Sequence, residues 1–305
     1  MLEQVVDHIP MSGLDAPPLT QEDFESLAYF LLAKREESSV ISDASKLFPL
    51  RNVDEVYEIH KYMAKTMSTL GKHIGWKCGA CDEVAWKRMG LMEPFRAPLF
   101  SRRIYNSPSD VNMVGDNVFL LEAEFAFMLG KNLPPREHQD YSTAEVWDAV
   151  SLIAPAIEIV GSRWSNAIRE KAVDLQVIAD GGVNVGAALG RGIRVEQARR
   201  DLDAVDVSFI VNGNVATSGS GAKVLGHPIK SLTWLANHLC NYGVSTQDSK
   251  YGASAPGLAE GDIVMSGACC MLFDFNVGDE VVADFGEFGQ VKVLIKSNDK
   301  PKFKL

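Results

Sequence analysis

Long hydrophobic runs are missing from this sequence. Nowhere in its 305 residues does an uninterrupted apolar stretch approach the roughly 18 residues that a membrane-spanning helix needs. Residues 1–18 also lack the apolar core of a secretory signal, because Glu3, Asp7 and Asp15 interrupt them. We therefore expect no membrane partner, and we interpret residues 1–18 as a flexible N-terminal arm.

Positive charge is scarce as well. The chain has 30 Lys and Arg residues against 40 Asp and Glu residues, which gives a formal net charge of -10. A nucleic-acid partner requires a basic face, so this balance argues against one. A small anionic substrate is not excluded, because a bound metal ion or a few local cations can override the overall field.

The sequence also lacks the cysteine and histidine patterns that are typical of disulfide-rich proteins and zinc sites. The 5 cysteines are an odd number in a long chain, which favours reduced thiols and a cytoplasmic protein over a disulfide framework. Cys78 and Cys81 form a CxxC motif, but no second pair with suitable spacing follows it. The 6 histidines show no ligand spacing, so we expect no zinc site.

The spacing of apolar residues changes about a quarter of the way along the chain. Residues 19–71 contain apolar residues at helical spacing, with a second helix predicted over about residues 54–70. Beyond them, short apolar runs alternate with glycine turns, which indicates mostly strand. A capping box that begins at Ser142 predicts a helix reaching about Ile153. We therefore predict a helical N-terminal lobe at 19–71 and a mixed-β catalytic domain at 72–298.

Three glutamates lie in segments that are otherwise apolar. Residues 119–129 alternate, and as a strand they place Glu122 and Glu124 on one face, about 7 Å apart at roughly 3.3 Å per residue. Glu158 lies in the more apolar run 156–160. A carboxylate buried alone is costly, so the three suggest a shared cation, and their oxygen ligands favour Mg²⁺ or Mn²⁺. A sheet with one solvated side is the alternative explanation.

Two further segments have residue types that suit chemistry. Lys77 lies between Gly75 and Gly79, and a lysine that is partly desolvated beside a metal has a lowered pKa suited to acid–base work. A surface lysine on a strand edge is the alternative. Ser218, Gly219 and Ser220 follow a predicted hairpin turn and could offer backbone N–H groups and hydroxyls to a carboxylate. The alternative for them is a plain connecting loop.

The order of these motifs resembles a known family. Along the chain come Gly75-Trp76-Lys77, Leu121-Glu122-Ala123-Glu124, Glu158-Ile159-Val160-Gly161-Ser162-Arg163, Ala179-Asp180, Ser218-Gly219-Ser220-Gly221 and Gly261-Asp262-Ile263-Val264-Met265-Ser266-Gly267. Together they resemble the 2-keto-4-pentenoate hydratase and 4-oxalocrotonate decarboxylase branch of the fumarylacetoacetate hydrolase superfamily. The Glu-x-Glu pair combined with Glu-Ile-Val-Gly-Ser is specific, whereas each piece alone is not.

The resemblance implies a fold and roles for particular residues. The implied fold is α+β, a mixed β-roll like the family's C-terminal domain with an N-terminal helical cap, assembled as a homo-oligomer. Lys77 matches the family's general acid–base. Three residues match the metal ligands, namely Glu122, Glu124 and Glu158. The residues assigned to the substrate are Ser162, Asp180, Ser218, Gly219 and Ser220.

The resemblance also implies an activity, the hydration of a small 2-hydroxy-dienoate or 2-oxo-alkenoate in aromatic catabolism. Hydratases usually carry an aspartate after the segment that ends here at Phe100, whereas this chain has Ser101-Arg102-Arg103. Arg102 could clamp a second carboxylate of a 2-oxo acid substrate, or it could be a solvated surface arginine. A decarboxylase, a C–C hydrolase and a non-catalytic homologue therefore remain as alternatives.

Overall fold

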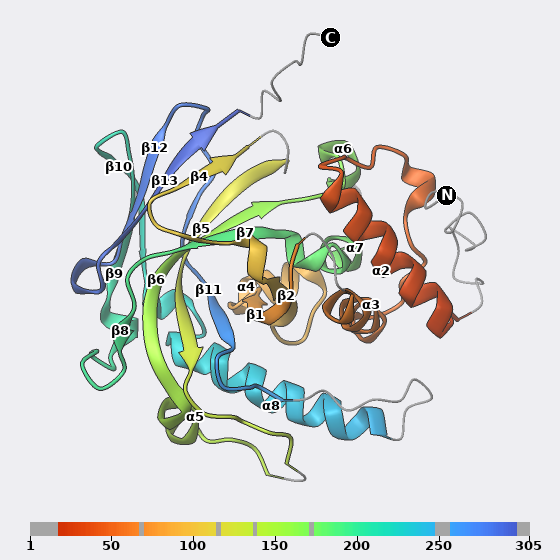
Figure 1. Ribbon diagram of the computed structural model, residues 1–305, viewed down its shortest axis with the longest axis horizontal. Coiled ribbons are helices and arrows are strands. Elements are labelled where there is room, and N and C mark those ends of the chain that lie inside the picture. The colour runs from red at the N-terminus through yellow and green to blue at the C-terminus, as the bar shows by residue number, and fades with distance from the viewer. Residues whose placement is uncertain are drawn as a thin grey trace.

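The computed structural model describes residues 18–66, 70–113, 117–136, 139–170, 174–247 and 257–297. Two β-sheets lie side by side, and most helices gather at one end of them (Figure 1). No helix within these ranges is long and apolar enough to cross a membrane. The predicted arm lies almost wholly outside the described residues, and the division at residues 19–71 and 72–298 stays a prediction.

The larger sheet is mixed and curls back on itself. Its strand order is β2-β1-β11-β5-β6-β7-β3, with β8 paired to β6. The strands are β1 (His73–Gly79), β2 (Phe95–Phe100), β3 (Ile104–Asn106), β5 (Val118–Leu129), β6 (Val150–Gly161), β7 (Asn184–Leu189), β8 (Ile193–Arg194) and β11 (Ile263–Leu272). Strand β1 runs parallel to β11, and β3 runs parallel to β7, while the other pairs are antiparallel. Because β2 also contacts β7, the sheet forms a roll.

The smaller sheet covers one face of the larger one. Its order is β10-β9-β12-β13-β4, and its strands are β4 (Ser109–Asn112), β9 (Asp206–Val211), β10 (Asn214–Ser220), β12 (Glu280–Asp284) and β13 (Gln290–Lys296). Phe125 of β5 meets Phe285 and Phe288 edge to face, with ring centroids 5.2 and 5.3 Å away. These aromatic contacts join the two sheets in one core. The expected mixed β-roll is confirmed.

Helices supply the predicted N-terminal cap. The α-helices are α2 (Gln21–Glu36), α3 (Val53–Lys65), α4 (Glu83–Met89), α5 (Thr143–Ala149), α6 (Asn166–Arg169), α7 (Asp174–Ala179) and α8 (Pro228–Gln247). Thr20 starts α2 through a full capping box with Asp23, as its sequence predicts. Helices α2 and α3 pack together, and α6 and α7 lie beside them at the same end of the roll (Figure 1). This group has a hydrophobic core of its own.

Three local predictions were wrong in extent. The second helix ends at Lys65, well before residue 70. The helix after Ser142 ends at Ala149, because β6 begins at the next residue and pairs with β5 along its length. The segment expected to be a loop at 218–220 is part of strand β10. A Cβ at Gly219 would lie 2.0 Å from the carbonyl oxygen of Cys269, so glycine lets β10 approach β11 closely.

All five cysteines are buried and free, which agrees with the expectation of reduced thiols. Burial raises the pKa of the Cys78 thiol well above its ordinary value, and the nearby Glu124 carboxyl adds to this. A thiol that stays protonated is a weak nucleophile and a weak metal ligand. The CxxC motif therefore packs as part of the core around β1.

His60 of α3 is a fully buried histidine in the N-terminal helical group. Its Nε2 lies 2.8 Å from the carbonyl oxygen of Ile178, while its Nδ1 has no hydrogen-bond partner. This geometry fits the neutral ring that donates from Nε2. Burial, reinforced by the charge of Arg96, lowers the pKa of His60 to about 3.

We predict that this histidine makes the protein sensitive to acid. In the unfolded chain His60 binds a proton below about pH 6.5, whereas in the folded protein its pKa is about 3. The protein therefore loses stability as the pH falls from about 6.5 toward 3. The contribution is up to about 1.4 kcal/mol for each pH unit. Urea unfolding at pH 7 and pH 5 measures it. In His60→Gln the free energy of unfolding should differ less between pH 7 and pH 5 than it does in the wild-type protein. An unchanged difference would contradict the assignment.

Candidate active site

Strands β5 and β6 bring the three predicted metal-binding glutamates together. Their antiparallel register places Glu122 directly opposite Glu158, and Glu124 lies two residues along the same face of β5. One carboxylate oxygen from each residue lies within 4.8 Å of the other two. Glu124 and Glu158 are both 0% exposed. The alternative of ordinary glutamates on a solvated face therefore does not hold for these two.

Each of the two buried glutamates has one oxygen held by the protein and one without a partner. The backbone N–H of Gly267 donates to Oε2 of Glu124 at 2.8 Å, and Nδ2 of Asn184 donates to Oε1 of Glu158 at 2.9 Å. Oε1 of Glu124 and Oε2 of Glu158 are buried with no hydrogen-bond partner. Leaving such oxygens unsatisfied is costly, and a hard cation would satisfy both. The residues therefore fit a divalent metal ion.

Gly267 reaches Glu124 because β11 is irregular at this point. Its register against β5 shifts between Met265 and Ala268, which turns a backbone N–H toward the acidic cluster. Gly267 has a φ of 98°, and a Cβ there would lie 2.6 Å from Sγ of Cys81. Only glycine suits this position.

Lys77 of β1 completes the cluster. Its Nζ lies 3.2 Å from Oε1 of Glu158 and 5.2 Å from the centroid of the Phe95 ring. The residue is only 3% exposed, which excludes the alternative of a surface lysine. On its other side, a Cβ at Gly182 would lie 3.1 Å from Cε of the lysine. The ammonium group is therefore enclosed by carboxylates and apolar atoms.

A lowered Lys77 pKa was expected beside a metal ion and stays a prediction for the metal-bound protein, whereas in the metal-free protein this pKa shifts upward. Burial acts to lower this pKa, but the charges of Glu158, Glu122 and Glu124 outweigh it and raise the pKa above its ordinary value. The three carboxylates come from strands remote from Lys77 in sequence, so their effect on its pKa is not visible in the residues around it. Lys77 consequently holds its proton at neutral pH, which suits a general acid.

The glutamates shift in the same direction for a different reason. Burial, with a further contribution from Glu158, raises the pKa of Glu122 to about 7 and that of Glu124 well above its ordinary value. Buried carboxylates that lie close together usually take up protons when no cation is present, because protonation removes their negative charge. The metal-free cluster therefore carries at least part of a proton at pH 7.

We predict that binding of Mn²⁺ releases protons from this cluster. A divalent cation favours the charged carboxylates, so it displaces the proton that Glu122, with a pKa of about 7, partly holds near neutral pH. The raised pKa of Glu124 acts in the same direction. Calorimetric titration in buffers with different ionisation enthalpies measures the release from the slope of observed enthalpy against buffer enthalpy. The slope should correspond to about one proton at pH 6.5 and should diminish toward pH 9. A flat plot at pH 6.5 would contradict the prediction.

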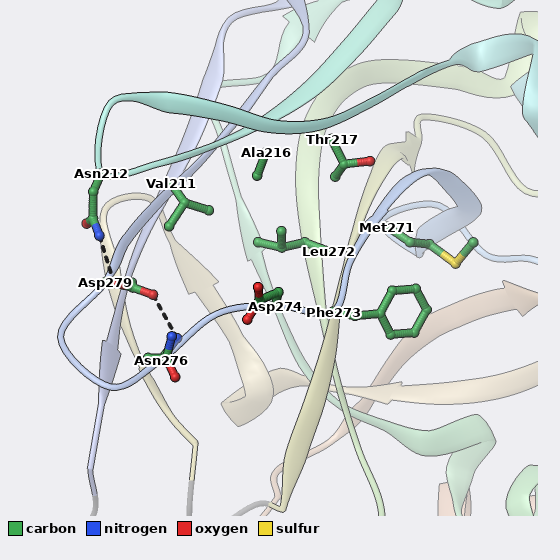
Figure 2. Close-up of a pocket in the computed structure, with 10 residues that line it drawn as sticks. All are labelled: Val211, Asn212, Ala216, Thr217, Met271, Leu272, Phe273, Asp274, Asn276 and Asp279. Atoms are coloured by element: carbon green, nitrogen blue, oxygen red, sulfur yellow. Dashed lines mark hydrogen bonds between the residues drawn. The ribbon is translucent and has the colours of Figure 1, made fainter.

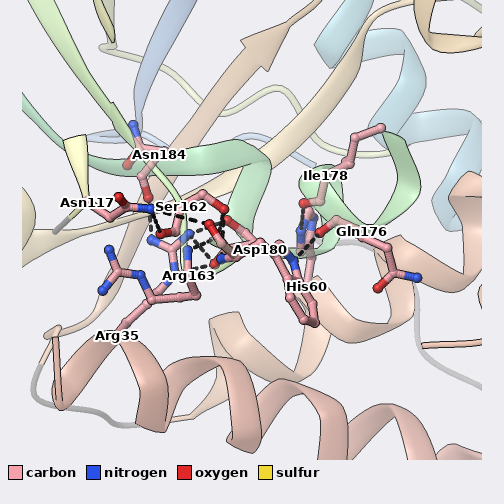
Figure 3. A network of polar contacts seen from close by, with 10 residues as sticks. Arg35, His60, Asn117, Ser162, Arg163, Gln176, Ile178, Asp180 and Asn184 are labelled. Carbon is pink, nitrogen blue, oxygen red and sulfur yellow. Dashed lines mark hydrogen bonds and ion pairs between the residues drawn. The ribbon is translucent and has the colours of Figure 1, made fainter. Parts of the chain in front are cut away.

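Ser162 and Asp180 lie together, but their polar atoms are satisfied inside the protein (Figure 3). The Ser162 hydroxyl donates to Oδ2 of Asp180 at 3.0 Å, and the backbone N–H of Arg163 donates to the same oxygen at 2.6 Å. Arg35 of α2 donates to Oδ1. Both predicted residues are 0% exposed. This geometry favours a role in building the wall of the site, and substrate contact by Ser162 and Asp180 stays a prediction.

The other residues assigned to the substrate lie on different elements from the three glutamates of β5 and β6. Ser218, Gly219 and Ser220 lie in β10 of the smaller sheet, paired with β9. Arg102 is exposed in a short 3-10 helix, Ser101–Arg103, and its backbone N–H donates to the carbonyl of Leu70. Their predicted part in substrate binding is therefore carried by the sequence alone.

A separate hollow of about 640 Å³ lies between the β9–β10 hairpin and the end of β11 (Figure 2). Its wall is part apolar, with Val211, Leu272 and Phe273, and part polar, with Asn212 and Asp279. None of the residues predicted for the site lines it. We therefore do not assign it to the candidate active site.

The sequence did not reveal the roles of two supporting residues. Asn184 is a lone amide at the start of an apolar strand, and Gly267 was one glycine among 25. Neither has a spacing that marks it, because both act on residues more than 20 positions away in the chain. A polar side chain inside the buried run 183–189 was the one available signal.

The chain is similar to known proteins over most of its length. Residues 95–296 match the fumarylacetoacetate (FAA) hydrolase C-terminal family. A 2-keto-4-pentenoate hydratase of Paraburkholderia xenovorans (strain LB400) is 27% identical over 283 residues, which cover 92% of this chain and 97% of that protein. A 2-oxo-hept-4-ene-1,7-dioate hydratase of Escherichia coli is 24% identical over 88% of this chain and 98% of that protein.

Solved structures share the fold. The 4-oxalocrotonate decarboxylase from Pseudomonas putida G7, complexed with magnesium and adipate, superposes with a TM-score of 0.77 at 22% identity. The match covers 91% of this chain and 99% of that chain. With the match over residues 95–296, the chain belongs to the fumarylacetoacetate hydrolase family.

Proposed function

We propose that this protein is a divalent-metal-dependent hydratase that adds water to a small 2-hydroxy-dienoate or 2-oxo-alkenoate of the 2-keto-4-pentenoate type. The observation that carries the proposal is the position of the buried Lys77 beside the three-glutamate cluster, with its Nζ 3.2 Å from Oε1 of Glu158. This places a general acid beside a group of oxygen ligands. Relatives named as hydratases of such acids support the choice of reaction.

Metal binding is the first task of these residues. We propose Glu122, Glu124 and Glu158 as the ligands and Mg²⁺ or Mn²⁺ as the ion, because all three donors are hard carboxylate oxygens. When bound, such an ion stabilises the negative charge of an enolate on a 2-oxo acid. The unpartnered oxygens of Glu124 and Glu158 supply the negative charge that would hold it.

Proton transfer is the second task, and we assign it to Lys77. The proton on its Nζ passes to the far carbon of the dienolate, which leaves a 2-oxo-3-enoate and a neutral amine. Water then adds to the electrophilic carbon, and the amine takes up the proton that the water loses. The enolate that remains takes a proton from solvent on carbon, which replaces the enol proton that the substrate gave to solvent when it formed the dienolate. The lysine thus returns to its charged form, which its carboxylate neighbours favour.

A decarboxylase of a related 2-oxo acid is the second candidate. The observation that favours it is the sequence Ser101-Arg102 where hydratases usually have an aspartate. Oγ of Ser101 accepts the backbone N–H of Lys72 at 3.1 Å, so this serine is engaged in local structure. Loss of CO₂ would leave its bonding electrons in an enolate of the 2-oxo acid, which the same metal ion would stabilise when bound. Lys77 would then protonate the carbon that carried the lost carboxylate.

An ultraviolet assay distinguishes these candidates. The purified protein is mixed with 2-hydroxypenta-2,4-dienoate and with 4-oxalocrotonate, each with Mg²⁺ or Mn²⁺ and with a chelator as control. Loss of dienoate absorbance with formation of a hydroxy-oxo acid supports hydration, and CO₂ release from the dicarboxylate supports decarboxylation. Cleavage of a C–C bond in a longer 2-oxo acid would indicate a hydrolase. Metal binding without turnover of any of them would indicate a non-catalytic homologue.

Assembly and location complete the proposal. We propose a homo-oligomer, supported by exposed apolar side chains on the β10–β11 side of the molecule, namely Val215, Met271 and Phe273. Sedimentation of the purified protein tests this directly. A cytoplasmic location stays an expectation from the reduced cysteines and the charge balance.

A further inference from the structure

A buried chain of polar contacts links the N-terminal helix α2 to the acidic cluster. Figure 3 shows the part of it around Arg35, Asp180 and Asn184. Arg35 lies near the end of α2 and is only 6% exposed. Its guanidinium donates to Oδ1 of Asp180 and to the backbone carbonyls of Asp180 and Asn184. The side chain of Asn184 in turn donates to Glu158. One arginine from the helical cap is therefore a single residue away from a proposed metal ligand.

Arg35 holds both ends of an unusual turn. The three residues between Asp180 and Asn184 all have positive φ values, 60° for Gly181, 62° for Gly182 and 56° for Val183. For a β-branched residue this backbone is strained and persists only when its surroundings hold it. By binding the carbonyl on each side, the guanidinium closes the turn.

The same turn sets the direction of the Asn184 side chain. Asn184 is the first residue of β7, and it is 6% exposed, so its amide cannot be satisfied by bulk water. It donates to Oε1 of Glu158 at 2.9 Å and leaves Oε2 unpartnered. A ligand whose second oxygen is fixed in this way presents its free oxygen in one orientation.

We propose that Asn184 is a positioning residue for Glu158, and that Arg35 fixes Asn184 through the turn at 181–183. The helical N-terminal segment is then a structural part of the metal centre. The inference rests on the proposed metal site, and it goes beyond that proposal because it assigns metal affinity to residues that do not bind the ion.

Mn²⁺ affinity, measured by calorimetry or electron paramagnetic resonance, tests the proposal without an activity assay. Asn184→Ala should weaken Mn²⁺ binding roughly 10- to 100-fold, the usual cost of removing a group that orients a ligand. Arg35→Lys keeps the charge but loses the fork that spans the turn, so it should weaken binding by a smaller factor. Asn237→Ala is the matched control, because that amide hydrogen-bonds to the backbone of Tyr141 instead.

A double-mutant cycle separates transmission from two independent effects. If Arg35 acts through Asn184, Arg35→Lys should cause little further loss in an Asn184→Ala background. Additive losses would overturn the role of Arg35, and wild-type affinity in Asn184→Ala would overturn the whole proposal. A lower melting temperature of the metal-free variants with unchanged Mn²⁺ affinity would show a merely structural role and would also overturn it.

Two controls keep these outcomes distinct. If Arg35→Lys does not fold, Asp180→Asn replaces it, because this change weakens the same clamp with almost no change in volume. Failure of the wild-type protein to bind Mn²⁺ would refute the metal centre itself. Binding by wild type that survives in every variant would refute only the positioning roles.

Discussion

Glu124→Gln is expected to abolish both Mn²⁺ binding and turnover while leaving a folded protein. The change removes one charge and almost no volume from a side chain that is fully buried. The Gly267 N–H can still donate to the amide oxygen, but the amide nitrogen then occupies the position of the unpartnered Oε1. We expect affinity to fall by more than the roughly 100-fold that loss of a supporting residue costs.

The same variant should stabilise the metal-free protein, which distinguishes a site defect from unfolding. The pKa of Glu124 is raised in the folded state, so the wild-type protein loses stability as the pH rises above about 4.5. Glutamine does not titrate and so removes that loss. The increase in the free energy of unfolding caused by Glu124→Gln should therefore be larger at pH 8 than at pH 5. Urea unfolding in the presence of a chelator measures it. Retained Mn²⁺ binding in Glu124→Gln would exclude this residue as a ligand.

A matched control exists elsewhere in the fold. Glu58 of α3 is also buried, and it pairs with Lys61 at 3.1 Å rather than with the cluster. Glu58→Gln should leave Mn²⁺ affinity unchanged. Equal loss of affinity in both variants would point to a general effect on folding.

Lys77→Met is expected to lower kcat by about 10²- to 10⁴-fold, the usual contribution of a general acid–base. Methionine keeps the length and apolar character of the stem, which packs near Phe95 and Gly182. The loss should therefore be chemical rather than steric. Undiminished activity would discard Lys77 as the proton donor.

Metal binding should respond to Lys77→Met in the opposite direction. The ammonium lies 3.2 Å from Oε1 of Glu158 and partly neutralises the cluster, so its removal leaves more negative charge for a cation. We expect Mn²⁺ affinity to be unchanged or higher. Lys87→Met on the exposed face of α4 is the control and should change neither quantity.

Local pattern was a good guide to single strands and a poor guide to their ends. The alternation of residue types over 119–129 predicted β5 almost to the residue, since such a pattern is a local property of the sequence. The helix after Ser142 was predicted to be too long because pairing of β6 with β5 takes over at Val150. The end of this helix is therefore set by pairing with another strand, and no local signal in the sequence near Val150 indicates it.

The candidate site divides in a similar way. Glu122 and Glu124 could be placed on one face of a strand because they are two residues apart. Their meeting with Glu158 depends on the β5–β6 register, and the approach of Lys77 depends on β1 beside β11. The resemblance to a family named these residues together, and the two registers explain why they meet.

By itself the sequence indicated that three carboxylates lie in apolar segments and suggested that they share a neutralising partner. That followed from local periodicity and from the cost of burying an unpaired charge. Tertiary structure alone decided that Lys77 keeps its proton, because three carboxylates surround it. It also decided that Asn184 and Gly267 hold the ligands. Electric fields and hydrogen bonds depend on distances in space, and distances between remote segments exist only once the chain has folded.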